Sequence, residues 1–177
     1  MSEKHGFVIK KYGQLLQCIL FIGCYMILNA AYFSIPFNLF SQLIYYHGVV
    51  MICADLINMI TPLEQVVATQ NHLISAKADL EIVRGCDGAG VLFLLISAIA
   101  VFPANFGRKL IGFGLGISLI YGINIMRICG LYFVISHHPE WLQLIHIYVA
   151  PTLMVVVGCI YFAWWAFGSI NQIHEST

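Results

Sequence analysis

The stretch EIVRGCDGAGVLFLLISAIAVF, residues 81–102, places a single cysteine where a charged segment meets an apolar run. Glu81, Arg84 and Asp87 lie on the polar side, and nearly every residue after Asp87 is apolar or small. A structural cysteine would be expected inside the apolar run, and a disulfide cysteine would need a partner on the same side of a membrane. The position of Cys86 therefore raises the question of whether its thiol is reactive.

The composition of the whole chain identifies an integral membrane protein. Of its 177 residues, 60% are hydrophobic and 9% are charged, whereas soluble domains carry about 25% charged residues. The formal net charge is zero, so composition gives no reason to expect a nucleic-acid partner. The length suits one membrane-embedded domain, residues 1–177.

The hydropathy pattern predicts an all-α integral membrane fold, a small multi-span helical bundle. Four segments qualify as full spans of about 20 apolar residues: 15–37, 89–106, 110–135 and 147–167. Segment 38–60 is too polar to face lipid, so we expect an interfacial or re-entrant helix there. Polar and apolar residues alternate in HLISAKADLEIV, residues 72–83, which predicts a short hairpin on the outer face.

Basic residues predict the orientation of the bundle, because short segments rich in Lys and Arg stay cytoplasmic. They cluster at the N-terminus and in one later turn: Lys4, Lys10, Lys11, Arg108 and Lys109. If both places are cytoplasmic, an even number of spans separates them, and segment 38–60 does not cross. The N-terminus and the C-terminal tail are then cytoplasmic, and Cys86 lies on the outer side.

Cys86 is expected at the first turn of the helix that includes Ala89. A helix N-terminus carries unpaired N–H groups and partial positive charge, which would lower the pKa of the thiol. Gly88 would let a substrate backbone approach closely, and Asp87 is a candidate helix cap, although its charge would oppose thiolate formation. The alternative is an inert interfacial cysteine, since most cysteines behave as small hydrophobic residues.

Arg127 stands inside an otherwise apolar predicted span, where ionisable residues usually mark function. A helical rise of about 1.5 Å per residue puts Arg127 about 27 Å above Lys109, near the far boundary of a hydrocarbon core of about 30 Å. Asn124 is on the same helix face and is expected to orient the guanidinium. The alternative is an arginine that extends to the outer headgroups.

His146, in HHPEWLQLIHIYVAPTL, begins the last span at the same level. Taken alone it would be an ordinary interfacial histidine, and His137 and His138 are expected in a solvated loop. Together, a thiol, a guanidinium and an imidazole from three helices supply the parts of acyl transfer by cysteine. Cys86 would be the nucleophile, His146 the general acid or base, and Arg127 the group that stabilises the oxyanion or orients the substrate carbonyl.

These motifs resemble the exosortase/archaeosortase family of multi-pass membrane cysteine transpeptidases. The resemblance covers roughly residues 83–167 and rests on CDG at Cys86, NIMRI at Arg127 and IHIYVAP at His146. By this resemblance these three residues are catalytic, and Asn124 matches the family's Asn-x-x-Arg pattern. The commoner family pattern after the cysteine is Ser-Gly, whereas this chain has Asp87-Gly88 and is shorter than the many-span members. Both departures favour a short subtype similar to exosortase H.

The resemblance implies that the chain processes proteins bearing a C-terminal sorting signal of the PEP-CTERM type: a short motif, a transmembrane helix and a basic tail. Cleavage would occur on the outer face through a thioester on Cys86, and an unidentified acceptor would take the acyl group. The implied location is the inner membrane of a Gram-negative bacterium, within the lipid bilayer. The chemistry calls for no cofactor and no metal, and the sequence has no Cys-x-x-Cys motif.

Other classes of protein remain as alternatives. A membrane thiol oxidoreductase would need a second exposed cysteine to exchange a disulfide, and only Cys86 is predicted on the outer side. A small transporter could use Arg127 as an anion site, but this would not account for Cys86 and His146 at the same level. The third alternative is an assembly subunit without catalysis.

The predicted topology can be tested by labelling introduced cysteines in intact cells. We expect a membrane-impermeant thiol reagent to label cysteines placed within residues 68–84 and 136–143. Cysteines that replace Arg108 or Lys109 should be labelled only after the membrane is permeabilised. Labelling of the first two segments only after permeabilisation would contradict an outer site.

Overall fold

The computed structural model describes residues 2–36 and 41–175, and most of them are helical. Three helices in this part of the chain are long and apolar enough to cross a membrane: Gly13–Ser34, Phe106–His137 and Pro139–Gly168. The prediction of an all-α membrane bundle is thereby confirmed in outline. The end of the predicted first span, Phe37, and the start of segment 38–60 lie outside the described residues, as do the side chains of Lys4, Lys10 and Lys11.

The helices follow one another along the chain with few strands between them. In order they are α1 (Ser2–Ser34), the π-helix η1 (Ser41–Val50), α3 (Met51–Ile60), the 3-10 helix η2 (Pro62–Glu64), α4 (Ala89–Val101), α5 (Phe106–His137), the 3-10 helix η3 (Pro139–Trp141), α6 (Leu142–Leu144), the π-helix η4 (Ile145–Val149) and α7 (Ala150–Glu175). Strands β1 (Val67–Thr69), β2 (His72–Ile74) and β3 (Asp79–Glu81) form an antiparallel sheet in the order β1-β2-β3.

The predicted hairpin in residues 72–83 is confirmed, and the sheet adds a strand that was not predicted. Strands β2 and β3 pair in the register His72 with Glu81 and Leu73 with Leu80. Leu73 is fully buried, as the alternating pattern predicts for one face of a strand. Strand β1 pairs with β2 through Ala68 and Leu73.

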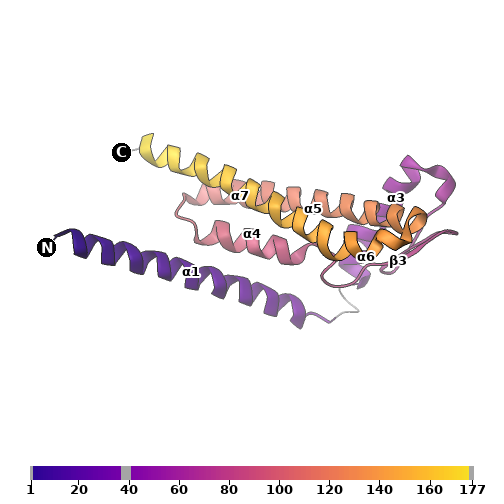
Figure 1. The fold of residues 1–177 in the computed structure, drawn as a ribbon, viewed down its shortest axis with the longest axis horizontal. Helices are drawn as coiled ribbons and strands as arrows, with labels where there is room; N and C mark the ends of the chain where they lie inside the picture. The colour runs from indigo at the N-terminus through magenta and orange to yellow at the C-terminus, as the bar shows by residue number, and fades with distance from the viewer. Residues whose placement is uncertain (1, 37–40, 176–177) are drawn as a thin grey trace.

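The long helices lie lengthwise in the molecule (Figure 1). Both termini and the turn between α4 and α5 lie at one end, and α3, β3 and α6 lie at the other. Arg108 and Lys109, in the first turn of α5, are therefore at the same end as the N-terminus. This arrangement is the one that the topology prediction requires of the basic residues.

Helix α4 is shorter than the predicted span 89–106, because it ends at Val101. Phe102 is extended, with φ −63° and ψ 136°, and it precedes Pro103, whose ring disfavours helical backbone in the residue before it. The 13 residues of α4 rise only about 20 Å, against a hydrocarbon core of about 30 Å. The fourth full span is thus not found among the described helices.

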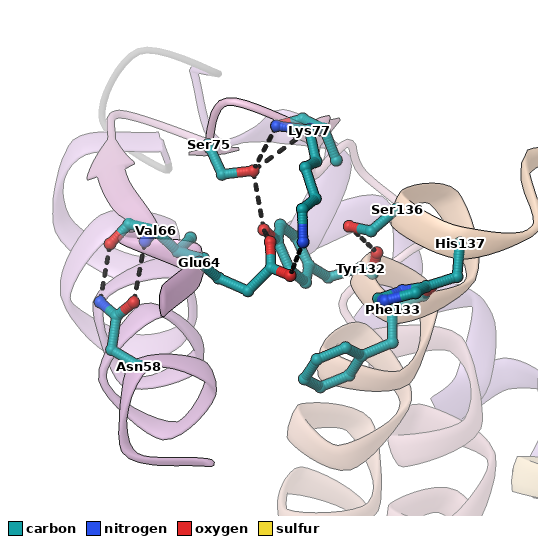
Figure 2. Close-up of polar contacts among 10 residues, drawn as sticks. Asn58, Glu64, Val66, Ser75, Lys77, Tyr132, Phe133, Ser136 and His137 are labelled. Carbon is teal, nitrogen blue, oxygen red and sulfur yellow. Dashed lines mark hydrogen bonds and ion pairs between the residues drawn. The ribbon is translucent and has the colours of Figure 1, made fainter. Parts of the chain in front are cut away.

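Residues 41–83, here called the cap, pack on the C-terminal half of α5. Helices η1 and α3 run beside α5: the Tyr121 hydroxyl donates a hydrogen bond to the Gly48 carbonyl, and Cys53 Sγ lies 3.9 Å from the Ile125 carbonyl oxygen. Figure 2 shows how the Asn58 amide pairs with both backbone polar groups of Val66, each at 2.8 Å. The described part of segment 38–60 is therefore a pair of successive helices that pack on α5 by one face, and their apolar part is shorter than the three candidate spans.

Helices α5 and α7 pack closely at the opposite end of the bundle. A Cβ atom at Gly112 would lie 2.5 Å from Trp165 Nε1, so only glycine leaves room for the indole. The Tyr161 hydroxyl donates to the Gly112 carbonyl at 2.8 Å, and Trp165 Nε1 donates to the Arg108 carbonyl at 3.2 Å. Small residues at such contacts are typical of membrane helices, where packing rather than the hydrophobic effect holds helices together.

A buried carboxylate fastens the cap to α5 (Figure 2). Glu64 is 6% exposed; it accepts a hydrogen bond from Lys77 Nζ at 2.7 Å and one from the Tyr132 hydroxyl at 3.0 Å. The same hydroxyl is hydrogen bonded to Ser75 Oγ at 2.7 Å. Lys77 and Ser75 come from the β2–β3 turn, so the network joins this turn, η2 and α5.

The Glu64 network predicts that acid weakens the cap. The hydrogen bond from Lys77, helped by the one from Tyr132, outweighs burial and holds the pKa of Glu64 below its usual range. A lowered folded-state pKa stabilises the fold above the ordinary carboxyl pKa of about 4.3, and that stabilisation is lost as pH falls through the folded-state value. We expect the thermal midpoint of the detergent-solubilised protein to fall on acidification, and to fall less in Glu64→Gln. An equal acid dependence in both proteins would contradict this role.

Candidate active site

Cys86 lies in the turn that connects β3 to α4, and not in the first turn of the helix as predicted. Helix α4 begins at Ala89, and Gly88 is its N-cap residue. The Cys86 N–H donates to the Val83 carbonyl at 3.0 Å, and Gly85 and Gly88 have φ angles of 96° and 75°. Glycine adopts this left-handed region at no steric cost, which accounts for the glycines on both sides of the cysteine.

Three predicted residues meet at this turn from three parts of the fold. Cys86 Sγ lies 3.4 Å from His146 Nε2, and Arg127 Nη2 donates to the backbone carbonyl of Cys86. All three residues are partly buried. The separation between sulfur and imidazole nitrogen is within reach of proton transfer, since such contacts are often loose in the absence of substrate.

His146 is presented by a distorted turn. It lies in the π-helix η4, where the N–H of Ala150 bonds to the carbonyl of Ile145, five residues earlier. Pro151 follows immediately; it has no N–H, and its ring clashes with the carbonyl four residues before it. Proline therefore accounts for the widened turn, and short π segments of this kind are frequent at functional sites.

Arg127 has no carboxylate partner in the described part of the chain. Its Nε is buried and has no hydrogen-bond partner there, and no ion pair to it is formed. The guanidinium thus keeps donor capacity beyond the bond to the Cys86 carbonyl. A partly buried cation with unused donors is suited to binding a carbonyl oxygen or an anion.

Asn124 contacts the turn rather than the guanidinium. It is 1% exposed, and neither of its amide atoms has a hydrogen-bond partner among the described residues. The expected hydrogen bond from Asn124 to Arg127 is therefore not formed. A Cβ atom at Gly88 would lie 3.3 Å from Asn124 Cγ and Oδ1 and 2.9 Å from Met154 Cε. Gly88 is thus required for close packing of this turn on α5 and α7.

Asp87 is not the cap residue of α4 as predicted, because Gly88 occupies that position, but it makes one contact at the start of the helix and two that were not predicted. Its Oδ1 accepts a hydrogen bond from the Ala89 N–H at 3.1 Å. Its Oδ2 accepts hydrogen bonds from the hydroxyls of Tyr45, at 3.0 Å, and Tyr32. Sequence reasoning missed both tyrosines, because Tyr32 lies in an apolar span and Tyr45 in a segment of ambiguous polarity, and neither is near Asp87 in the chain.

The environment of Cys86 favours the neutral thiol. Burial raises the pKa of Cys86 above its usual value, and the positive charge of Arg127 and a hydrogen bond from the Val83 backbone to the thiol oppose this rise without cancelling it. The prediction that a helix N-terminus lowers the thiol pKa is therefore wrong, because Cys86 precedes the helix and is partly buried. To react as a nucleophile the thiol would need a base, and His146 Nε2 is in contact with its sulfur.

His137 and His138 form their polar contacts with residues close to them in the chain. His137 ends α5 with Nδ1 3.1 Å from the Phe133 carbonyl oxygen, and His138 lies 3.3 Å from a Glu140 carboxylate oxygen; both are exposed. All six cysteines are free. Among the described residues, no group of three or more His, Cys, Asp or Glu side chains could hold a metal ion.

The chain matches no protein-family model, no curated protein and no solved structure. Its function must therefore be inferred from its own residues. The strongest single feature is a cysteine in contact with both a histidine and an arginine that come from distant parts of the sequence.

We expect Arg127→Gln to move the pH midpoint of Cys86 alkylation upward, because Arg127 is the main charge that favours the thiolate. Alkylation by iodoacetamide would be followed between about pH 6 and about pH 10, a range that brackets ordinary thiols, by mass spectrometry of the Cys86 peptide. Arg108→Gln, at the opposite end of the bundle, should leave the midpoint unchanged. A lower or unaltered midpoint in Arg127→Gln would contradict the electrostatic assignment.

Proposed function

We propose that this chain is a membrane-embedded cysteine peptidase and transpeptidase of the exosortase type, with Cys86 as its nucleophile. The observation that carries the proposal is the contact of 3.4 Å between Cys86 Sγ and His146 Nε2, beside a guanidinium that holds the cysteine backbone. A nucleophile within reach of a base, next to a fixed donor, is the arrangement that acyl transfer requires.

The reaction begins with His146 Nε2 accepting the thiol proton while Cys86 Sγ bonds to the carbonyl carbon of the scissile peptide. The tetrahedral intermediate collapses, the C–N bond breaks, and the leaving amine takes the proton from His146. A thioester remains on Cys86. An acceptor nucleophile then transfers its proton to His146 and attacks the thioester carbonyl; collapse releases the product, and His146 returns the proton to sulfur.

Arg127 serves two purposes in this proposal. The hydrogen bond from Nη2 to the Cys86 carbonyl fixes the backbone of the nucleophile, and the donors that remain stabilise the oxyanion or orient the substrate carbonyl. Asn124, whose amide atoms have no hydrogen-bond partner in the part of the chain that the structure describes, lies against Gly88 and offers a second polar group next to the turn. Preorganised donors of this kind act most strongly where water is excluded.

The proposed substrates are proteins with a C-terminal sorting signal of the PEP-CTERM type, on the basis of the family resemblance. Such a signal combines a recognition motif, a transmembrane helix and a basic tail. We propose cleavage on the periplasmic side of the bacterial inner membrane, with the N-terminus of the enzyme in the cytoplasm. The acceptor would be a nucleophile on that same side.

The contacts of the site support the three alternative functions less well. A thiol oxidoreductase needs a second thiol beside the first. The cysteines that lie beside each other are Cys53 and Cys129; both are buried, and each thiol donates a hydrogen bond to a backbone carbonyl. A transporter or an assembly subunit would need no imidazole in contact with Cys86.

Substrate processing in cells tests the proposal. Cys86→Ala and His146→Ala should stop processing, because the nucleophile or the proton-transfer group is lost. Arg127→Lys should reduce the rate by about 10²–10³, the usual cost of losing one oxyanion donor, since lysine cannot reproduce the planar set of donors of arginine.

The exposed histidines provide matched controls, because His137→Ala and His138→Ala remove an imidazole without touching the turn. Both should process substrate normally, with the protein level checked by immunoblot in every variant. Normal processing by Cys86→Ala would exclude the proposed nucleophile. Full activity of Arg127→Lys would remove the oxyanion role, and loss of activity in a control but not in His146→Ala would move the acid or base to residues 137–138.

A further inference from the structure

The turn that carries Cys86 is held on both sides by the C-terminal end of α1. Two residues before Cys86, Arg84 donates from Nη1 to the Phe33 carbonyl at 3.4 Å and from Nη2 to the Ile35 carbonyl. The Arg84 guanidinium also lies 5.5 Å from the centre of the Tyr32 ring, within the range of a cation–π contact. The cation thereby satisfies carbonyls at the end of α1, where a helix lacks internal donors.

One residue after Cys86, the Asp87 carboxylate is bound by two phenols from different helices. Tyr32 comes from the end of α1 and Tyr45 from η1; their hydroxyls bond to Asp87 Oδ2 and lie 3.0 Å from each other. Tyr45 is fully buried and Tyr32 is 7% exposed. These contacts connect Asp87 with residues 42 and 55 positions away.

Helix α1 packs along α4, but only 6% of its membrane-spanning window is buried. Polar contacts concentrated at one end of a nearly unburied helix suggest that this end has a role beyond packing, since a span can be retained in a membrane without them.

The carboxylate of Asp87 opposes ionisation of the neighbouring thiol. The groups that face Cys86 are Arg127 from α5, His146 from η4 and Asp87 from its own turn. Hydrogen bonds from two phenols stabilise the carboxylate and disperse its charge, so its repulsion of a thiolate is weaker than that of an unbound carboxylate. Tyr32 and Tyr45 therefore moderate an unfavourable charge that lies next to the nucleophile.

We propose that Tyr32 and Tyr45 are positioning residues that act on Cys86 through Asp87. The C-terminal end of α1 would then contribute directly to the geometry of the site. The hydrogen-bonded group of Tyr32, Tyr45 and Asp87, here called the clamp, fixes the turn that carries the Cys86 thiol. Its relevance to turnover rests on the proposed peptidase function, whereas its effect on the thiol does not.

The test is the pH profile of Cys86 alkylation by iodoacetamide in the full-length protein, measured by mass spectrometry. Tyr32→Phe, Tyr45→Phe and the double variant keep the rings and remove only the hydroxyls. Each should move the midpoint upward, the double variant by roughly half a pH unit or more. Asp87→Asn should move it downward, because the opposing charge is gone.

The decisive variant combines Asp87→Asn with both Tyr→Phe changes. If the phenols act through the carboxylate, the two Tyr→Phe changes should not raise the alkylation midpoint once the charge of Asp87 is removed. The effects of the tyrosine and aspartate changes are then not additive. The same upward shift in both backgrounds would overturn the proposal, as would an unchanged or lowered midpoint in the double Tyr→Phe variant. Tyr121→Phe, which loses a hydroxyl bonded to the Gly48 carbonyl, is the control and should not move the midpoint.

The two proposals fail in different ways. Loss of the predicted alkylation pattern, while Cys86→Ala still abolishes processing, would refute the clamp and leave the peptidase function standing. The predicted pattern together with normal processing by Cys86→Ala would support the clamp and refute the peptidase function. Each detergent-solubilised variant should elute as a single species in size-exclusion chromatography, which shows that a changed midpoint or a loss of processing is not caused by misfolding.

Discussion

The hydrogen bond from the Arg127 guanidinium to the Cys86 carbonyl is the contact on which the arrangement of the site depends. A cation part-way along a membrane helix is costly unless polar groups meet it, and here the partner is a backbone carbonyl rather than a carboxylate. This hydrogen bond to the backbone holds the turn before α4 against α5. Gly88 then has to pass beside Asn124 with no room for a side chain, and the thiol comes within 3.4 Å of His146.

The cap gives the turn a second support. Helices η1 and α3 run beside α5 and lead to the sheet, and the sheet returns the chain to Cys86. The Glu64 network joins the cap to Tyr132 of α5, and the hydrogen bond from Tyr45 to Asp87 joins η1 to the turn that carries Cys86. The site thus lies where the cap meets the membrane-spanning helices.

Two prolines set the geometry of the helices around the site. Pro103 ends α4 early, so α4 is too short to span a membrane alone and rests between α1, α5 and α7. Pro151 widens the turn that carries His146. In each case the ring acts on backbone that precedes it. Both prolines are visible in the sequence, but a hydropathy pattern averages over many residues and does not register a single proline. Segment 89–106 was predicted as a full span for this reason.

The sequence by itself determined the membrane class, the hairpin in residues 72–83, and the proximity of Cys86, Arg127 and His146, because apolar length, alternation and depth along a helix are local properties. Tertiary structure alone decided the other contacts of the turn that carries the thiol. Tyr32 and Tyr45 reach Asp87 from distant helices, and Asn124 meets Gly88 instead of Arg127. The proton affinity of Cys86 was likewise not predictable, since it depends on burial by segments far away in the chain, and burial exists only once the helices have packed.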